Sequence, residues 1–192
     1  MEQDKHMTTK KQVIRLVIIA VVLVGAFFGG RELYYARHIT QNSIQVKLES
    51  ADLTKQSSGI IQGTVEKKLS TKRFTDASGE LMVNTLWQVK IDETYKGTFS
   101  QSLVVETPGG RYGLTEVVVE DAPTLAVGEK VLLYLQPIES SSDYQLTGQF
   151  QGHFTVTKDE KGNEVFVQQG TEIKETKTLI KEEIKAINVQ QE

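Results

Sequence analysis

One apolar run near the N-terminus constrains this chain more than any other feature. Residues 16–30, LVIIAVVLVGAFFGG, contain no charged side chain. Flanking apolar and aromatic residues extend the run to residues 13–35, which is long enough for the roughly 20 residues of a membrane-spanning helix. Tyr34 and Tyr35 at its end suit the membrane–water interface. Three basic residues flank the run on its N-terminal side: Lys10, Lys11 and Arg15.

Basic flanks remain in the cytoplasm, so the run predicts a signal anchor in the cell membrane. Residues 1–12 then form a cytoplasmic tail, residues 13–35 cross the membrane once, and the body lies outside the cytoplasm. The alternative is a cleaved signal peptide, because Val24-Gly25-Ala26 satisfies the small-residue rule for cleavage and the body would then be secreted. We favour the anchor because the apolar run continues through Phe27 and Phe28.

Composition excludes several classes of function. The chain has no cysteine, which excludes a thiolate zinc site, an iron–sulfur cluster, a cysteine nucleophile and any disulfide. The formal net charge is −3, and the bases before the apolar run make the remainder more acidic than that total. An acidic body predicts no nucleic-acid partner, since phosphate binding needs a basic surface.

The body follows the period of two that is typical of β-strands. Residues 36–58 are mostly polar and predict a juxtamembrane connector with one short element, either a strand or a helix. The strands expected after it are 60–69, 81–95, 103–107, 111–119, 130–135 and 144–150, and then a hairpin over 153–167. An amphipathic helix is expected from about Thr178, with Ile180, Ile184 and Ile187 on one face. Short strands with few helices between them predict a mainly β domain over residues 59–192, folded as a small closed barrel.

The order of these signals resembles a known module. Residues 60–65 (IIQGTV) open a strand, 87–91 (WQVKI) lead into Tyr95-Lys96-Gly97, and Val127-Gly128-Glu129 precedes 131–135 (VLLYL). This pattern, over residues 60–156, is similar to the OB-fold barrel of netrin-like modules and tissue inhibitors of metalloproteinases, and to exported bacterial domains of the same pattern. The resemblance implies an OB-like closed barrel. Metalloproteinase inhibitors act through an N-terminal cysteine, so their mechanism does not carry over to a chain without one.

Residues that commonly carry chemistry are scattered in this sequence. His6, His38 and His153 lack the spacing of metal ligands and are expected to be exposed to solvent. The stretch from Ser140 to Asp143 lacks the G-x-S-x-G motif of a nucleophilic serine and predicts a loop. We therefore expect no enzymatic activity, no cofactor and no metal.

One segment is a candidate for partner contact. Residues 107–113, TPGGRYG, combine three glycines with an arginine and a tyrosine, which are common in binding hot spots. The candidate contact residues are Gly109, Gly110, Arg111 and Tyr112, although an ordinary tight connection explains the glycines equally well, and Tyr112 could instead point into the barrel.

Two further features each have two interpretations. Trp87 is either a core residue, which its alternation with Val89 favours, or a stacking platform. The C-terminal helix either closes a barrel end or docks a partner.

The sequence thus predicts a non-catalytic binding or interaction module of the cell envelope, held by its membrane anchor. An envelope protein of unknown identity is the expected partner. A protease-inhibitor-like or regulatory domain is one alternative. An envelope hydrolase, with a site assembled from scattered acids, is another.

Overall fold

The structure is a computed structural model that describes residues 13, 15–28, 38–41, 47–76, 78–139 and 141–189, with the backbone alone at 38 and 39. The predicted cytoplasmic tail (1–12), the end of the predicted anchor (29–35) and much of the connector (36–37 and 42–46) lie outside the described residues, as do His6, the side chain of His38, and Ser140. Residues 15–28 form a helix whose side chains are all exposed. Within the described part of the chain, no helix combines the length and the apolar character needed to cross a bilayer.

The body is mainly β, as the period of two predicts. Its elements are β1 (His38–Gln41), α2 (Ser50–Gln56), β2 (Gly59–Thr75), β3 (Leu81–Lys96), β4 (Ser102–Pro108), β5 (Gly110–Tyr112), β6 (Thr115–Val119), β7 (Lys130–Pro137), β8 (Tyr144–Leu146), the 3-10 helix η1 (Gln149–Gly152), β9 (His153–Lys158), β10 (Glu164–Gln168), β11 (Lys174–Glu175) and α3 (Lys177–Val189).

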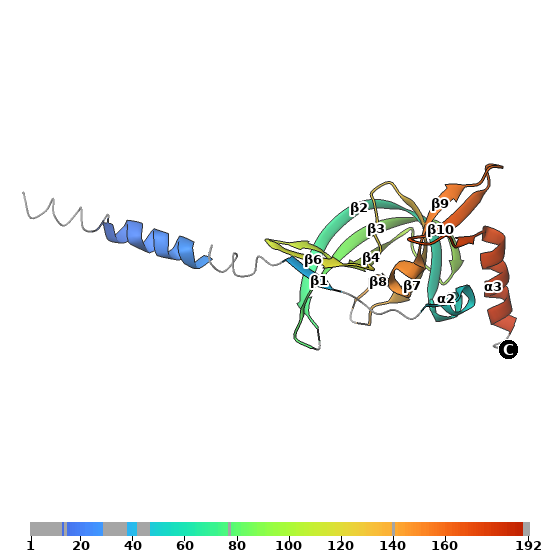
Figure 1. Ribbon diagram of the computed structural model, residues 1–192, viewed down its shortest axis with the longest axis horizontal. Helices are drawn as coiled ribbons and strands as arrows, with labels where there is room; N and C mark the ends of the chain where they lie inside the picture. The colour runs from blue at the N-terminus through green and yellow to red at the C-terminus, as the bar shows by residue number, and fades with distance from the viewer. Residues whose placement is uncertain are drawn as a thin grey trace, which may run out of the picture.

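The strands form two sheets. The larger has the order β11-β10-β9-β7-β2-β3-β4-β8, and β7 also pairs with β8. The smaller has the order β1-β6-β5, in which β1 and β6 are parallel. Strands β2 and β3 form a long, curved hairpin that reaches from the larger sheet to the smaller one (Figure 1).

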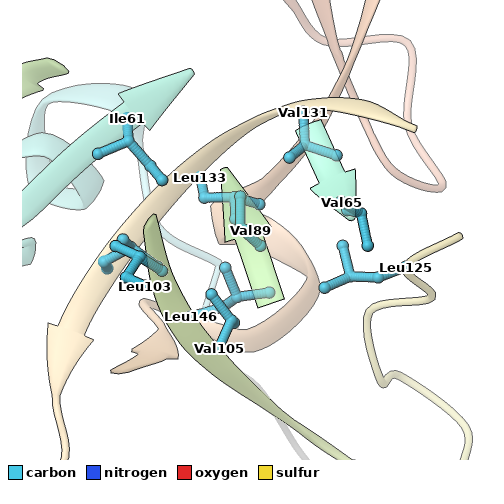
Figure 2. Packing of buried hydrophobic residues seen from close by; sticks show 10 residues of the cluster. Ile61, Val65, Val89, Leu103, Val105, Leu125, Val131, Leu133 and Leu146 are labelled. Atoms are coloured by element: carbon cyan, nitrogen blue, oxygen red, sulfur yellow. The ribbon is translucent and has the colours of Figure 1, made fainter. Parts of the chain in front are cut away.

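Alternation along the central strands divides the core into two clusters. In β7, Val131, Leu133 and Leu135 belong to one cluster, whereas Leu132 and Tyr134 belong to the other. Because neighbouring side chains in a strand point to opposite faces, both faces of β7 are buried. In the first cluster, side chains from β2, β3, β4, β7 and β8 and from Leu125 converge (Figure 2).

Helices α2 and α3 cover the second cluster. Leu53 of α2 and Ile180 of α3 are buried in it beside Phe154 and Phe166. The predicted face of the C-terminal helix is therefore the face that packs against the body. The helix covers the side of β7 opposite to the first cluster.

Two predicted strands differ from the observed ones because a left-handed glycine interrupts each of them. The expected strand 111–119 is a hairpin, since Gly113 has a φ of +59° and turns the chain between β5 and β6. The expected strand 144–150 stops at Leu146, because Gly148 is left-handed and begins the 3-10 helix η1. In β2 the register with β3 shifts between Gln62 and Gly63, and a Cβ on Gly63 would lie 2.4 Å from the Lys90 carbonyl oxygen, so a glycine is suited to this irregularity.

Candidate functional site

Gly109 and Gly110 connect β4 to β5 and lie directly against β3. The Gly109 amide donates to the Val83 carbonyl oxygen at 2.7 Å, and its own carbonyl oxygen accepts a hydrogen bond from Thr85 Oγ1 at 2.8 Å. Both glycines have positive φ, +89° and +132°. A Cβ on Gly110 would lie 2.4 Å from Thr85 Oγ1. Both glycines therefore have a structural role in this close approach.

We expect Gly110→Ala to lower the free energy of unfolding by at least about 2 kcal/mol, because it adds a steric clash to an unfavourable backbone conformation. Gly128→Ala is the matched control, since Gly128 has a φ of +86° with no atom within 4 Å of an added Cβ. It should cost about 1 kcal/mol. Urea denaturation of both variants measures the difference, and equal losses would contradict the close packing of Gly110.

Arg111 and Tyr112 face outward on β5. Both are exposed, Tyr112 to 44%, so that Tyr112 does not point into the core. The guanidinium of Arg73 on β2 lies 5.3 Å from the centre of the Tyr112 ring, within the range of a cation–π interaction. Hydrogen bonds hold both the side chain and the backbone of Arg111. Its Nε donates to the Gly113 carbonyl oxygen, and its own carbonyl oxygen accepts from Thr71 Oγ1 at 2.8 Å. The chain thus holds an arginine pair and a tyrosine together at one exposed edge.

The β5–β6 turn adds an exposed apolar side chain to this edge. Leu114 follows Gly113 in the turn and is 45% exposed. Behind the turn, Thr115 and Val117 of β6 are buried. The exposed side chains of the turn are therefore presented by a hairpin whose other face is packed.

The outer part of the β2–β3 hairpin is a second exposed surface. From Glu66 to Thr75, β2 is exposed at nearly every position, including the apolar Leu69 and Phe74. We call residues 66–75 and 81–86 the distal hairpin. Its inner face carries β5, through Thr71 and Arg73, so alternation places Lys72 and Phe74 on the outer face.

A buried carboxylate fixes the outer face of the distal hairpin to β4. Glu106 accepts hydrogen bonds from Lys72 Nζ at 2.8 Å and from Asn84 Nδ2 at 2.9 Å. Burial alone would raise the pKa of Glu106, but these two donors hold it below its usual value. The cluster joins β2, β3 and β4, which indicates a structural role.

Trp87 lies where the distal hairpin meets the first core cluster. Its ring is half-buried and packs against that cluster, and Nε1 donates to Thr107 Oγ1 at 2.9 Å. Lys68 Nζ lies 6.0 Å from the ring centre. The contacts favour the core interpretation of Trp87 over the stacking platform.

His153 is buried, so the prediction that it is exposed to solvent was wrong. Its exposed fraction is 1%, because it begins β9 directly after the 3-10 helix, inside the sheet. Nδ1 lies 2.6 Å from Gln169 Oε1, and Nε2 lies 3.5 Å from Glu129 Oε1. Thr155 also donates to Glu129, at 2.8 Å. These contacts fasten the segment around Glu129 to β9.

Two polar networks attach α3 to the body. In the first, Lys177 Nζ contacts Glu93 and Glu164, and Lys181 Nζ contacts Glu93, all at 3.0–3.1 Å. In the second, Glu175 accepts from Tyr134 and from Ser50, both at 2.7 Å. Burial raises the pKa of Glu175 above its usual value. Each network joins the C-terminal segment to strands or to α2. Glu164 and Lys177 of the first network also line a shallow pocket of about 450 Å³.

One cavity lies beside the connector. It measures about 320 Å³ and is lined in part by Leu48, Phe150, Gln151 and Ile173. The Leu48 amide donates to Gln151 Oε1 at 2.7 Å, which holds the connector as one wall of the cavity. This size is at the lower end of the range for small-molecule sites.

The acidic hairpin turn at Asp159 is explained by its own hydrogen bonds. Asp159 Oδ1 accepts from the amides of Lys161 and Asn163, and Oδ2 accepts from Asn163 Nδ2. Over the part of the chain that the structure describes, there is no group of three His, Cys, Asp or Glu residues placed to hold a metal ion.

Sequence reasoning named Gly109, Gly110, Arg111 and Tyr112 but missed their neighbours Arg73 and Leu114. Arg73 is distant in sequence and meets Tyr112 only through the packing of β5 on the hairpin. Leu114 directly follows Gly113, so the turn that the glycine allows was the sequence feature that could have indicated an exposed leucine. No protein-family model matches the chain. No curated protein matches it either.

Proposed function

We propose that this protein is a membrane-anchored, non-catalytic binding module of the cell envelope, built on an OB-like closed barrel. In this proposal residues 13–35 form the anchor and residues 1–12 lie in the cytoplasm. The body lies outside the cytoplasm and presents the distal hairpin to an envelope protein.

The strand pairings support the barrel. They run from β2 to β3, β4, β8 and β7, and the pairing of β7 with β2 completes a ring. Only β4 and β8 in this ring are parallel. The ring surrounds the first core cluster, as expected of a small barrel filled by side chains.

The helix over residues 15–28 supports the anchor. Its large apolar side chains are all more than half exposed, from 54% at Ile19 to 70% at Phe27. An apolar helix that no part of the described body covers needs an apolar solvent, which a bilayer supplies. This exposure is the observation that carries the proposed location.

The distal hairpin supports a binding role. Leu69 and Phe74 are exposed apolar residues on strands that extend beyond the part of the fold that encloses the core. Leu69 and Phe74 are thus exposed on an extension of the sheet where a partner can reach them.

The test uses the full-length chain in its own membranes. A photoreactive phenylalanine analogue replaces Phe74 in one variant and Val127 in the control. Val127 is 63% exposed, and its neighbour Gly128 binds the carbonyl oxygen of Val65, at the end of the distal hairpin opposite to Phe74. We expect the protein to resist carbonate extraction, with the body digested by protease added outside the cell. We further expect Phe74, and not Val127, to form one discrete protein adduct.

Each part of the proposal fails by a different result. A mature N-terminus at Phe27 would contradict the anchor and support a cleaved signal peptide. The same adducts at both positions, or none, would contradict binding by the distal hairpin. With the photoreactive analogue kept at residue 74, Leu69→Ala should weaken or abolish the adduct while stability changes by less than about 0.5 kcal/mol.

A further inference from the structure

We propose that the β5–β6 turn is a second membrane contact, in which Tyr112 and Leu114 enter the headgroup layer of the bilayer that holds residues 13–35. The inference rests on the proposed anchor. It names the lipid surface, and not a protein, as the partner of the predicted contact residues Arg111 and Tyr112.

The length of the chain brings β1 close to the membrane. The predicted span ends at Tyr35, and β1 begins at His38, three residues later. Three residues cover at most about 10 Å when fully extended. The first residue of β1 therefore lies within about 10 Å of the end of the span, whatever path the intervening residues take.

The register of the smaller sheet directs the β5–β6 turn toward that membrane. β1 and β6 are parallel, with His38 beside Glu116 and Gln41 beside Val119. The turn precedes β6, so it lies at the end of the sheet where β1 begins (Figure 1). Leu114 is two residues before Glu116, which places it up to about 7 Å beyond the first residue of β1. That reach matches the few ångströms of headgroup layer on each side of the hydrocarbon core.

The exposed side chains of the turn suit a lipid interface. Tyrosine is enriched at the headgroup level, where its ring and hydroxyl meet apolar and polar surroundings, and a leucine at the tip can enter the acyl boundary. Arg111, and Arg73 above the Tyr112 ring, supply guanidinium groups that bind phosphate oxygens. Tyr112 and Leu114 are each nearly half exposed in the body alone, and a bilayer would cover them.

The charges around the β5–β6 turn predict whether apolar insertion or attraction to anionic lipid contributes more to the membrane contact. Glu116 is the register partner of Arg111 across the hairpin and offsets its charge. Apolar insertion should therefore contribute more than attraction to anionic lipid. The contact should persist in phosphatidylcholine vesicles and at high salt.

The absence of cysteine makes the contact directly measurable. Leu114→Cys in the full-length chain gives a single attachment site for the fluorophore NBD. The labelled protein is reconstituted into vesicles of phosphatidylcholine, with and without phosphatidylglycerol. Quenching is recorded with lipids that carry a doxyl group near the headgroup, for residues 114 and 161, and with lipids that carry it deep in the acyl chain, for residue 22. Val22→Cys reports the predicted span. Lys161→Cys reports the β9–β10 turn, which is also exposed but belongs to the larger sheet.

We expect lipid quenching at residue 114 to exceed that at residue 161 at least about twofold, with a blue-shifted emission at 114. Quenching at residue 22 without quenching at 114 would overturn the second contact and leave the anchor intact. No quenching at residue 22 would overturn the anchor and, with it, this inference. A blue shift at 114 that lipid quenchers do not affect would mean that protein covers the turn, either a second copy or another partner, and would also overturn the lipid contact.

Discussion

Replacing Ile180 by alanine is expected to lower the free energy of unfolding by about 3 kcal/mol, because the side chain is fully buried among apolar neighbours. Its neighbour Leu179 provides the matched control. Leu179 is 48% exposed on the same helix, and Leu179→Ala should change stability by less than about 1 kcal/mol. The pair separates loss of packing from any effect of alanine on the helix itself.

Urea denaturation of the full chain in detergent micelles, followed by far-ultraviolet circular dichroism, measures both variants. The packing of α3 predicts one cooperative transition in which the helix and the strands unfold together. If both substitutions cost equally little, α3 is not held by the second core cluster. The helix would then be available to dock a partner, which was the other interpretation of its amphipathic sequence.

Alternation and glycine placement allowed much of the fold to be predicted. The run from Val131 to Leu135 is apolar at every position because both faces of β7 are buried, whereas the stretch from Leu81 to Lys96 alternates because much of one face of β3 is exposed. A period of two was sufficient to find β3 and the part of β2 up to residue 69. Strand β2 continues to Thr75, and the register shifts between Val65 and Lys67 and between Lys68 and Ser70 interrupt its alternation before that part.

The rest depended on contacts between distant residues. The period of two continues from Arg111 to Val119, and it hid the turn at Gly113 that separates β5 from β6. Burial of His153 follows from its contacts with Glu129 and Gln169, which no local pattern records. The position of β1 beside β6 was likewise invisible, because a parallel pairing across about 80 residues leaves no local signal.

The glycines that singled out the candidate contact segment have a structural role. Glycine density marked the segment, and those glycines are explained by their close approach to Thr85 and Val83. The exposed side chains that follow them, Tyr112 and Leu114, give the edge its chemistry. Whether they meet lipid or protein is decided by the fluorescence experiment and not by the glycines.

Replacing Trp87 by alanine is expected to cost about 3 kcal/mol, at the lower end of the range for large aromatic core residues, because the ring is half-buried. Two losses combine in this variant. The ring no longer packs against the first core cluster, and the buried hydroxyl of Thr107 loses the hydrogen bond from Nε1.

Trp87→Phe removes the hydrogen bond and one of the two indole rings, but keeps a six-membered ring against the first core cluster. It should therefore cost less than Trp87→Ala and more than the roughly 1 kcal/mol of one hydrogen bond. Trp87 is the sole tryptophan, so both variants lose the intrinsic fluorescence signal and circular dichroism must follow their unfolding. A loss below about 1 kcal/mol in Trp87→Ala would mean that the ring contributes little packing. In that case the aromatic face beneath Lys68 would be free to stack on a ligand, as the alternative interpretation of Trp87 requires.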